Sequence, residues 1–126
     1  MAFCNTFVCL LEAEFIVVAT AKGGQAAIDC VMQHRPQVAV LDLRMPILNG
    51  IETAKELRNM PSAPAVVICS VSIDSEVVEA AQQAGALGYV FKTHMSQDLV
   101  GAVKSAARGE RFISSHWSGH ARHRVH

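Results

Sequence analysis

Residues 38–50, VAVLDLRMPILNG, constrain the fold more than any other stretch of the chain. An apolar run of four to six residues, closed by Pro46 and Gly50, is typical of a strand that is buried on both faces of a parallel sheet. Asp42 stands where this run ends. A carboxylate in such a place costs free energy unless it has a partner or a task. We therefore take Asp42 as the first candidate functional residue.

Length, composition and charge predict one domain that contacts neither DNA nor a membrane. A chain of 126 residues, of which 51% are hydrophobic, is expected to form one domain with a proper core. The formal net charge is zero, which argues against direct DNA binding because phosphate recognition needs a basic surface. The sequence has no apolar run of transmembrane length and no signal-peptide pattern, so we expect a cytoplasmic protein without membrane contact.

The four cysteines, Cys4, Cys9, Cys30 and Cys69, form no CxxC pair and no zinc-ligand spacing. Reduced, mostly buried thiols are therefore expected rather than disulfides or a metal site.

Helical and strand patterns alternate along the chain. The hydrophobic spacing predicts helices over 3–11, 25–34, 51–59, 76–84 and 97–108, and strands over 15–20, 38–43, 65–70 and 87–91. Asp74 and Ser75 are both N-cap candidates for the helix over 76–84, and Ser96 is the expected N-cap of the last helix. Such alternation predicts an α/β fold in which helices wrap a parallel sheet through right-handed crossovers.

Three of the predicted strands end in polar side chains: Asp42, Ser70 and Lys92. Ligands of open parallel sheets gather at the carboxyl ends of the strands, so we expect the three residues to converge. The carboxylate can act as a nucleophile, the hydroxyl can donate a hydrogen bond, and the ammonium can neutralise charge. The combination suits a phosphoryl group.

The stretches LDLRMPILNG, AVVICS, AAQQAGALGYVFK and AARGER resemble the receiver domain of two-component response regulators, in particular receivers that precede a helix-turn-helix output domain. The resemblance covers roughly residues 5–113 and implies a flavodoxin-like, three-layer sandwich. It also implies signalling by protein contact with a histidine kinase or a sister response regulator. Such a protein is not a classical enzyme, and at most it catalyses its own phosphorylation and dephosphorylation.

The resemblance assigns a role to each candidate residue. Asp42 is implied to accept the phosphoryl group, Ser70 to reorient toward it and Lys92 to pair with it. Tyr89 is implied to be the aromatic switch residue on the usual partner surface. The Asp42 carboxylate and the backbone carbonyl of Arg44 are implied to bind Mg²⁺.

The N-terminus departs from this family pattern. Family receivers begin with a strand that ends in two adjacent acids, and the sequence predicts that both the strand and the acids are missing from this chain. Glu12 and Glu14 precede the strand at 15–20, so they lie at the amino end of the sheet, about 15 Å from Asp42 at about 3.3 Å per residue. Weak or absent Mg²⁺ binding and impaired phosphorylation are expected, because a divalent cation normally neutralises the two anions that this transfer brings together.

A missing first strand leaves three possible arrangements of the sheet. The strand at 15–20 could pair directly with 38–43, a partner chain could fill the gap, or the monomer could be unstable with open edges. We expect a homo-oligomer formed by element exchange. The corresponding functions are a receiver with impaired phosphorylation or, alternatively, a degenerate receiver that acts as a phosphorylation-independent dimerisation module. A nucleotide-binding enzyme is a weak third reading, because the turn at 22–24 is too short for a phosphate loop.

Residues 114–126 form a His- and Arg-rich tail after the receiver-like region 1–113. His116, His120, His123 and His126 have near-helical spacing that could ligate a metal ion. Gly119 and the lack of acidic partners favour a disordered tail instead.

Overall fold

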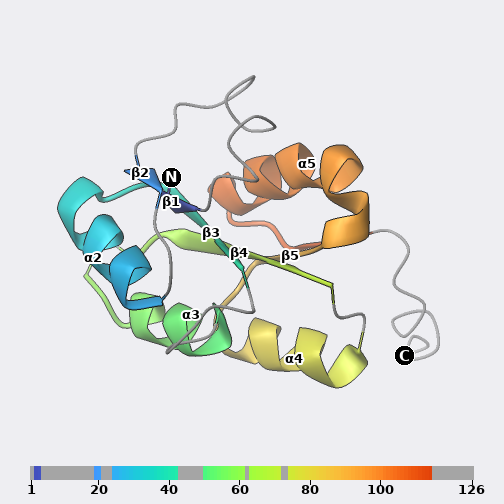
Figure 1. Cartoon of the computed structure of the whole chain (residues 1–126), viewed down its shortest axis with the longest axis horizontal. Coiled ribbons are helices and arrows are strands. Elements are labelled where there is room, and N and C mark those ends of the chain that lie inside the picture. Colours follow the sequence, from blue (N-terminus) through green and yellow to red (C-terminus); the bar gives the residue numbers. More distant parts are fainter. Residues whose placement is uncertain are drawn as a thin grey trace.

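The computed structural model describes residues 2–3, 19–20, 24–42, 50–61, 63–71 and 74–114 (Figure 1). The strands are β1 (Ala2–Phe3), β2 (Ala19–Thr20), β3 (Val38–Asp42), β4 (Ala65–Ser70), β5 (Gly88–Phe91) and β6 (Phe112–Ile113). The helices are α2 (Gly24–His34), α3 (Gly50–Arg58), α4 (Ser75–Gln83), the 3₁₀ helix η1 (Lys92–His94) and α5 (Met95–Ala107).

Every strand pair in the described part of the chain is parallel. β3, β4, β5 and β6 form a four-stranded sheet in that order, and β1 pairs with β2 in a second, two-stranded unit. β1 also lies against β3, so the strands follow one another as β2, β1, β3, β4, β5 and β6 (Figure 1). The order reverses between β1 and β3, as in doubly wound folds that bind ligands at such a switch point. The predicted α/β fold, a parallel sheet wrapped by helices, is confirmed.

The predicted loss of the first strand is wrong, because Ala2 and Phe3 form β1 in its place. The sequence predicted a helix over 3–11, but Phe3 belongs to β1. With β1 ending at residue 3 and β2 beginning at residue 19, the crossover is 4–18, which is 15 residues. That length satisfies the dozen or more residues that a parallel connection needs. Residues 4–18 lie outside the described residues, as does most of the predicted helix.

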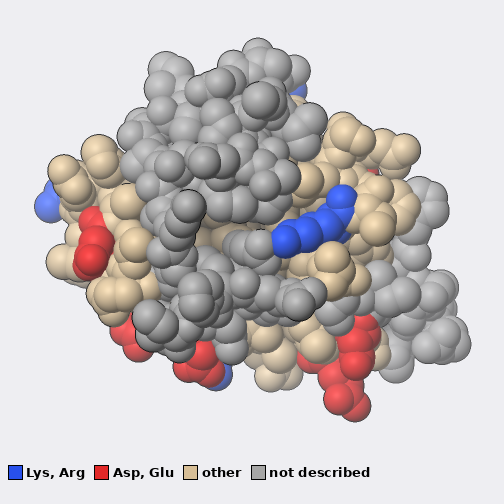
Figure 2. All heavy atoms as spheres, viewed as in Figure 1, with Lys and Arg blue, Asp and Glu red and all other residues tan. Residues whose placement is uncertain are grey.

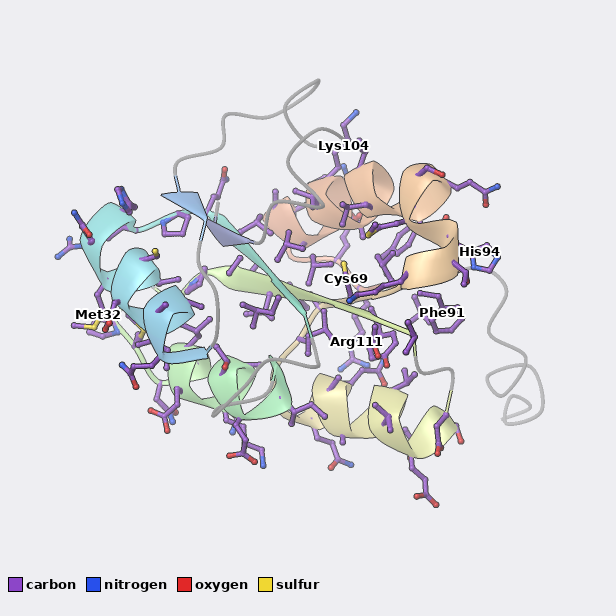
Figure 3. The ribbon with its side chains drawn as sticks, viewed as in Figure 1. Met32, Cys69, Phe91, His94, Lys104 and Arg111 are labelled. Atoms are coloured by element: carbon purple, nitrogen blue, oxygen red, sulfur yellow. The ribbon has the colours of Figure 1, made fainter. Side chains whose placement is uncertain are left out.

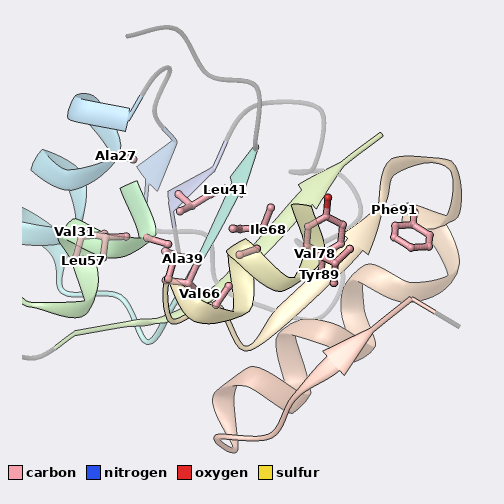
Figure 4. Close-up of a cluster of buried hydrophobic side chains, with 14 residues drawn as sticks. Ala27, Val31, Ala39, Leu41, Leu57, Val66, Ile68, Val78, Tyr89 and Phe91 are labelled. Atoms are coloured by element: carbon pink, nitrogen blue, oxygen red, sulfur yellow. The ribbon is translucent and has the colours of Figure 1, made fainter. Parts of the chain in front are cut away.

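Apolar side chains fill both faces of the sheet. On one face, α2, α3 and α4 pack on alternate residues of β3, β4 and β5 (Figure 4); the buried residues there include Ala27, Val31, Ala39, Leu41, Leu57, Val66, Ile68, Val78, Tyr89 and Phe91. On the other face, α5 packs on the residues in between, among them Val38, Val40, Val67, Cys69, Val90, Leu99 and Val103. The alternation explains why β3 and β4 read as unbroken apolar runs.

Most predicted boundaries agree with the structure to within one or two residues. The strand at 65–70 and the helix at 25–34 are confirmed, and Asp74 caps α4 by accepting a hydrogen bond from Glu76 N at 2.9 Å. The prediction that Ser96 caps the last helix is wrong. α5 begins at Met95 because η1 leads directly into it, with His94 at the N-cap position.

β6 was not predicted from the sequence. Phe112 and Ile113 pair with Gly88 and Tyr89, so β6 covers the outer edge of β5. Two residues are too few to show strand periodicity, and only the tertiary pairing makes them a strand.

Candidate functional site

The register of the sheet brings Asp42, Ser70 and Lys92 to one edge. Asp42, the last residue of β3, pairs with Cys69 of β4, and Ser70 is the next residue along β4. Ser70 in turn pairs with Phe91, the last residue of β5, and Lys92 follows directly. Adjacent strands lie about 4.8 Å apart, so three neighbouring strands deliver these residues to the same carboxyl edge.

Ser70 and Tyr89 are both buried, on the neighbouring strands β4 and β5. Ile68 pairs with Tyr89, and the exposed fractions of Ser70 and Tyr89 are both 1%. The rings of Tyr89 and Phe91 meet edge to face, with centroids 5.9 Å apart at an interplanar angle of 78°. Tyr89 therefore lies in the core between the sheet and α4, whereas the family resemblance placed it on a partner surface.

Lys92 begins η1, where the chain turns from β5 into α5. The ring of Phe91, the last residue of β5, packs against the ring of His94, the last residue of η1 (Figure 3). Their centroids are 6.3 Å apart. Thr93 Oγ1 lies 3.1 Å from His94 Nδ1. The residues before and after Lys92 are thus both in contact with His94: Phe91 through its ring and Thr93 through its hydroxyl.

The donor set around Asp42 fits Mg²⁺ poorly. Cys4 and Asn5 follow β1, and the first acidic residue of the chain is Glu12. Among the residues that the structure describes, no three His, Cys, Asp or Glu side chains come together as a metal-binding group. Mg²⁺ prefers carboxylates in octahedral geometry, and a single carboxylate with one carbonyl offers few of the ligands it needs.

Some candidate residues lie outside the described part. Arg44, whose carbonyl was the second expected metal ligand, is among them, and so are the tail histidines. For Asp42 the structure describes the backbone but not the side chain. The position of Asp42 at this edge of the sheet is therefore inferred from the pairing of β3 with β4.

A cavity of about 310 Å³ lies away from this edge. Val31, Met32, Arg35, Met60 and Pro61 line it, where α2 and α3 end and the chain enters β3 and β4. That is the amino end of the sheet. Met32, which is 61% exposed, lies on the opposite side of the molecule from Phe91 and His94 (Figure 3). The cavity is therefore separate from the candidate site.

Charged side chains gather on the outer helices. Figure 2 shows acidic side chains along the edge formed by α3 and α4, where Glu52, Glu56, Asp74, Glu76 and Glu79 are exposed. No helix in the described ranges is long and apolar enough to span a membrane.

Within the described part of the chain, one buried carboxylate oxygen has no hydrogen bond. It is Oδ2 of Asp98, in the first turn of α5. The positive end of the helix dipole stabilises a negative charge at that position, which offsets part of the cost of burial.

Ser114 is a site-associated residue that the sequence did not reveal. It is 2% exposed, and its Oγ accepts a hydrogen bond of 2.9 Å from the backbone N–H of Phe91. Serine in a sequence ending GERFIS has no distinguishing pattern. The role of Ser114 becomes apparent only from the pairing of β6 with β5.

A family model and two curated relatives all relate this chain to response regulators. Residues 2–104 match the family described as response regulator receiver domain. The nitrate/nitrite response regulator protein NarL of Escherichia coli is 37% identical over 104 residues, which cover 82% of this chain and 48% of that protein. The transcriptional regulatory protein PdtaR of Mycobacterium tuberculosis is 33% identical over 106 residues, which cover 84% and 51%. The chain thus spans about half the length of these relatives.

A solved structure shares the whole fold. The two-component response regulator of the LuxR family from Aurantimonas sp. superimposes with a TM-score of 0.88 at 28% identity, covering 99% of this chain and 95% of that one.

Proposed function

Because the chain belongs to the response regulator receiver domain family, we propose that it accepts a phosphoryl group on Asp42 from a histidine kinase and signals by protein–protein contact in the cytoplasm. The observation that carries the proposal is the strand register, which supports a common edge for Asp42, Ser70 and Lys92. A carboxylate, a hydroxyl and an ammonium at one edge suit phosphoryl transfer better than any other chemistry of these groups.

Each residue has a defined part in the proposed transfer. A carboxylate oxygen of Asp42 attacks the phosphorus of a phosphohistidine; the new O–P bond forms as the P–N bond breaks, and the imidazole leaves with the electron pair. The Ser70 hydroxyl donates a hydrogen bond to a phosphoryl oxygen, and the Lys92 ammonium neutralises the charge. Tyr89 is the proposed switch residue, and its burial beside Phe91 is the packing that a change of state would alter.

We propose that the transfer is impaired because the metal site is incomplete. Cys4 and Asn5 stand after β1, at the point where family receivers carry two acids. Without them, the repulsion between Asp42 and the incoming phosphoryl group is poorly neutralised.

The missing acids also favour a second candidate function. A receiver that cannot hold Mg²⁺ can still bind a kinase, a sister response regulator or a second copy of itself, and so act as an interaction module without phosphorylation. The described part of β1 is two residues long, whereas β3, against which it lies, has five. A short strand of this kind supports dimerisation by element exchange, because an identical strand from another chain can replace it.

Labelling with acetyl phosphate and Mg²⁺ tests the impaired transfer. Intact-mass measurement should show slow labelling, well below one phosphoryl group per chain, and Asp42→Asn should abolish it. The double variant Cys4→Asp/Asn5→Asp, which restores the acids after β1, should label at least about tenfold faster, since a cation in the site offsets charge repulsion worth more than 1.4 kcal/mol.

Three results would contradict these assignments. Fast, stoichiometric labelling of the natural sequence would refute the impairment, and labelling that survives Asp42→Asn would refute the acceptor. If neither protein labels, and beryllofluoride with Mg²⁺ shifts neither the melting temperature nor the oligomeric state, the interaction module is the better description.

A further inference from the structure

Residues 112–114 extend the ladder of β5 on its outer edge. Phe112 N donates to Leu87 O at 2.9 Å, and Ser114 N donates to Tyr89 O at 3.0 Å. The ring of Phe112 lies beside α5, 3.5 Å from the position that a Cβ atom would take at Gly101. This short segment is thus bound both to the strand that leads to Lys92 and to the helix that follows it.

The next rung of this ladder uses a side chain in place of the backbone. In a regular parallel ladder, the N–H of Phe91 would donate to the carbonyl oxygen of Ser114. It donates to Ser114 Oγ instead, at 2.9 Å, in a buried position. The hydroxyl therefore satisfies the last amide of β5 just after β6 ends at Ile113.

The anchored amide lies one residue before Lys92. Phe91 is the last residue of β5, and η1 begins at the lysine. The backbone at this point sets the direction in which the lysine leaves the sheet. The Phe91 ring is already packed against Tyr89 and His94, so the Ser114 hydroxyl fixes the remaining, outer side of the same residue.

We propose that Ser114 is a positioning residue for Lys92 and couples the chain beyond residue 114 to the phosphoacceptor edge. The inference rests on the proposed function of Asp42 and Lys92. A change at the lysine that moves Phe91 must stretch or break the bond to Ser114, and a pull on the chain after residue 114 must act on Phe91. By linkage, the two effects have equal coupling free energies.

The test compares Ser114→Ala with Ser114→Thr, which keeps the hydroxyl, and with Ser105→Ala on α5 as a matched control. All are made in the full chain and measured well below their melting temperatures. In Ser114→Ala, the Phe91 amide should exchange with solvent about tenfold faster, because one buried hydrogen bond is lost. The half-saturating concentration of beryllofluoride, with Mg²⁺ present, should rise several-fold, up to about tenfold.

Threonine should restore both values, and Ser105→Ala should resemble the natural sequence. Faster exchange at Phe91 without a change in beryllofluoride binding would reduce Ser114 to a structural residue and overturn the inference. If the natural sequence binds no beryllofluoride, the proposed function fails. The role of Ser114 is then tested by the backbone order of Lys92. Its NMR order parameter should then fall from about 0.85 toward the flexible range in Ser114→Ala. An unchanged order parameter would overturn the coupling.

Discussion

Gly88 lies in β5 directly opposite Val67 of β4, where the two strands leave no space for a side chain. A Cβ atom at this position would stand 3.0 and 3.2 Å from the two methyl groups of Val67, which is itself completely buried. Branched side chains in a packed core cannot turn away from such a contact. Glycine at residue 88 therefore sets how closely the two strands that carry Ser70 and Lys92 pack.

Replacing Gly88 by alanine should lower the free energy of unfolding by about 1–3 kcal/mol. Overpacking against Val67 outweighs the gain of about 0.4–1 kcal/mol from a less flexible unfolded chain. Gly101→Ala is the matched control, because its Cβ atom would meet only Phe112 at an ordinary 3.5 Å, in the interior of α5. That variant should be stabilised by up to about 1 kcal/mol. Urea titration of both variants measures the change in the free energy of unfolding. Changes of the same sign in the two variants would contradict the packing argument.

The types of the candidate site residues could be predicted from the sequence, but the residues that support them, Ser114 and Gly88, could not. Asp42, Ser70 and Lys92 are polar residues at the ends of apolar runs, and parallel topology alone places them together. Ser114 depends on a pairing between β5 and β6 that has no local signal. Gly88 has the same limitation, because its need for a small side chain comes from Val67, 21 residues away.

α3 and α4 show how two neighbouring elements are joined on the outer face. The guanidinium of Arg58, at the end of α3, donates through Nη1 to the carbonyl oxygen of Gln83, the last residue of α4, at 2.6 Å. The Cδ atom of the same arginine lies 3.1 Å from where a Cβ atom would stand at Gly85, which has a φ of +107°. The arginine therefore covers the turn that ends α4 and satisfies one of its free carbonyl groups.

The other end of α4 depends on Asp74. Replacing it by alanine removes the hydrogen bond from Glu76 N and should cost about 1 kcal/mol of stability. Asp74→Asn, which keeps the capping oxygen, should recover most of this loss. Thermal unfolding followed by circular dichroism measures both, and an alanine variant as stable as the asparagine variant would show that the cap contributes nothing.

The long periodic elements could be predicted well, and the N-terminal ones could not. Cap residues and proline or glycine boundaries mark α2, α3, β4 and α4 within a few residues. The spacing of residues 3–11 fits a helix, yet Phe3 belongs to β1, because its tertiary neighbours β2 and β3 decide its state. η1 likewise moves the start of α5 ahead of Ser96, since the turn after β5 continues directly into the helix.

At the scale of the molecule, the pairing of β6 with β5 leads us to expect the C-terminal boundary of the domain just after Ser114 rather than at the end of α5. A chain that ends after Ser115 should keep the free energy of unfolding of the full chain within about 0.5 kcal/mol. A chain that ends after Arg111 loses Phe112, Ile113 and the hydrogen bonds that residues 112–114 make with Leu87, Tyr89 and Phe91. It should be less stable by at least about 2 kcal/mol.

Chemical denaturation of the two truncated chains beside the full chain makes this comparison. A large loss on removing only residues 116–126 would show that the tail belongs to the folded domain. Equal stability of both truncated chains would show that β6 adds nothing to the sheet.

Residues 2–3 leave the ribosome before any of the strands that they contact. β2 ends at Thr20, and β3, against which β1 also lies, ends at Asp42. Until then residues 2–3 have no sheet to join, and pairings across such separations form slowly. The sheet is therefore completed from its rim inward. During that interval the edge of β3 is open, and this is the step at which the element exchange proposed above would begin.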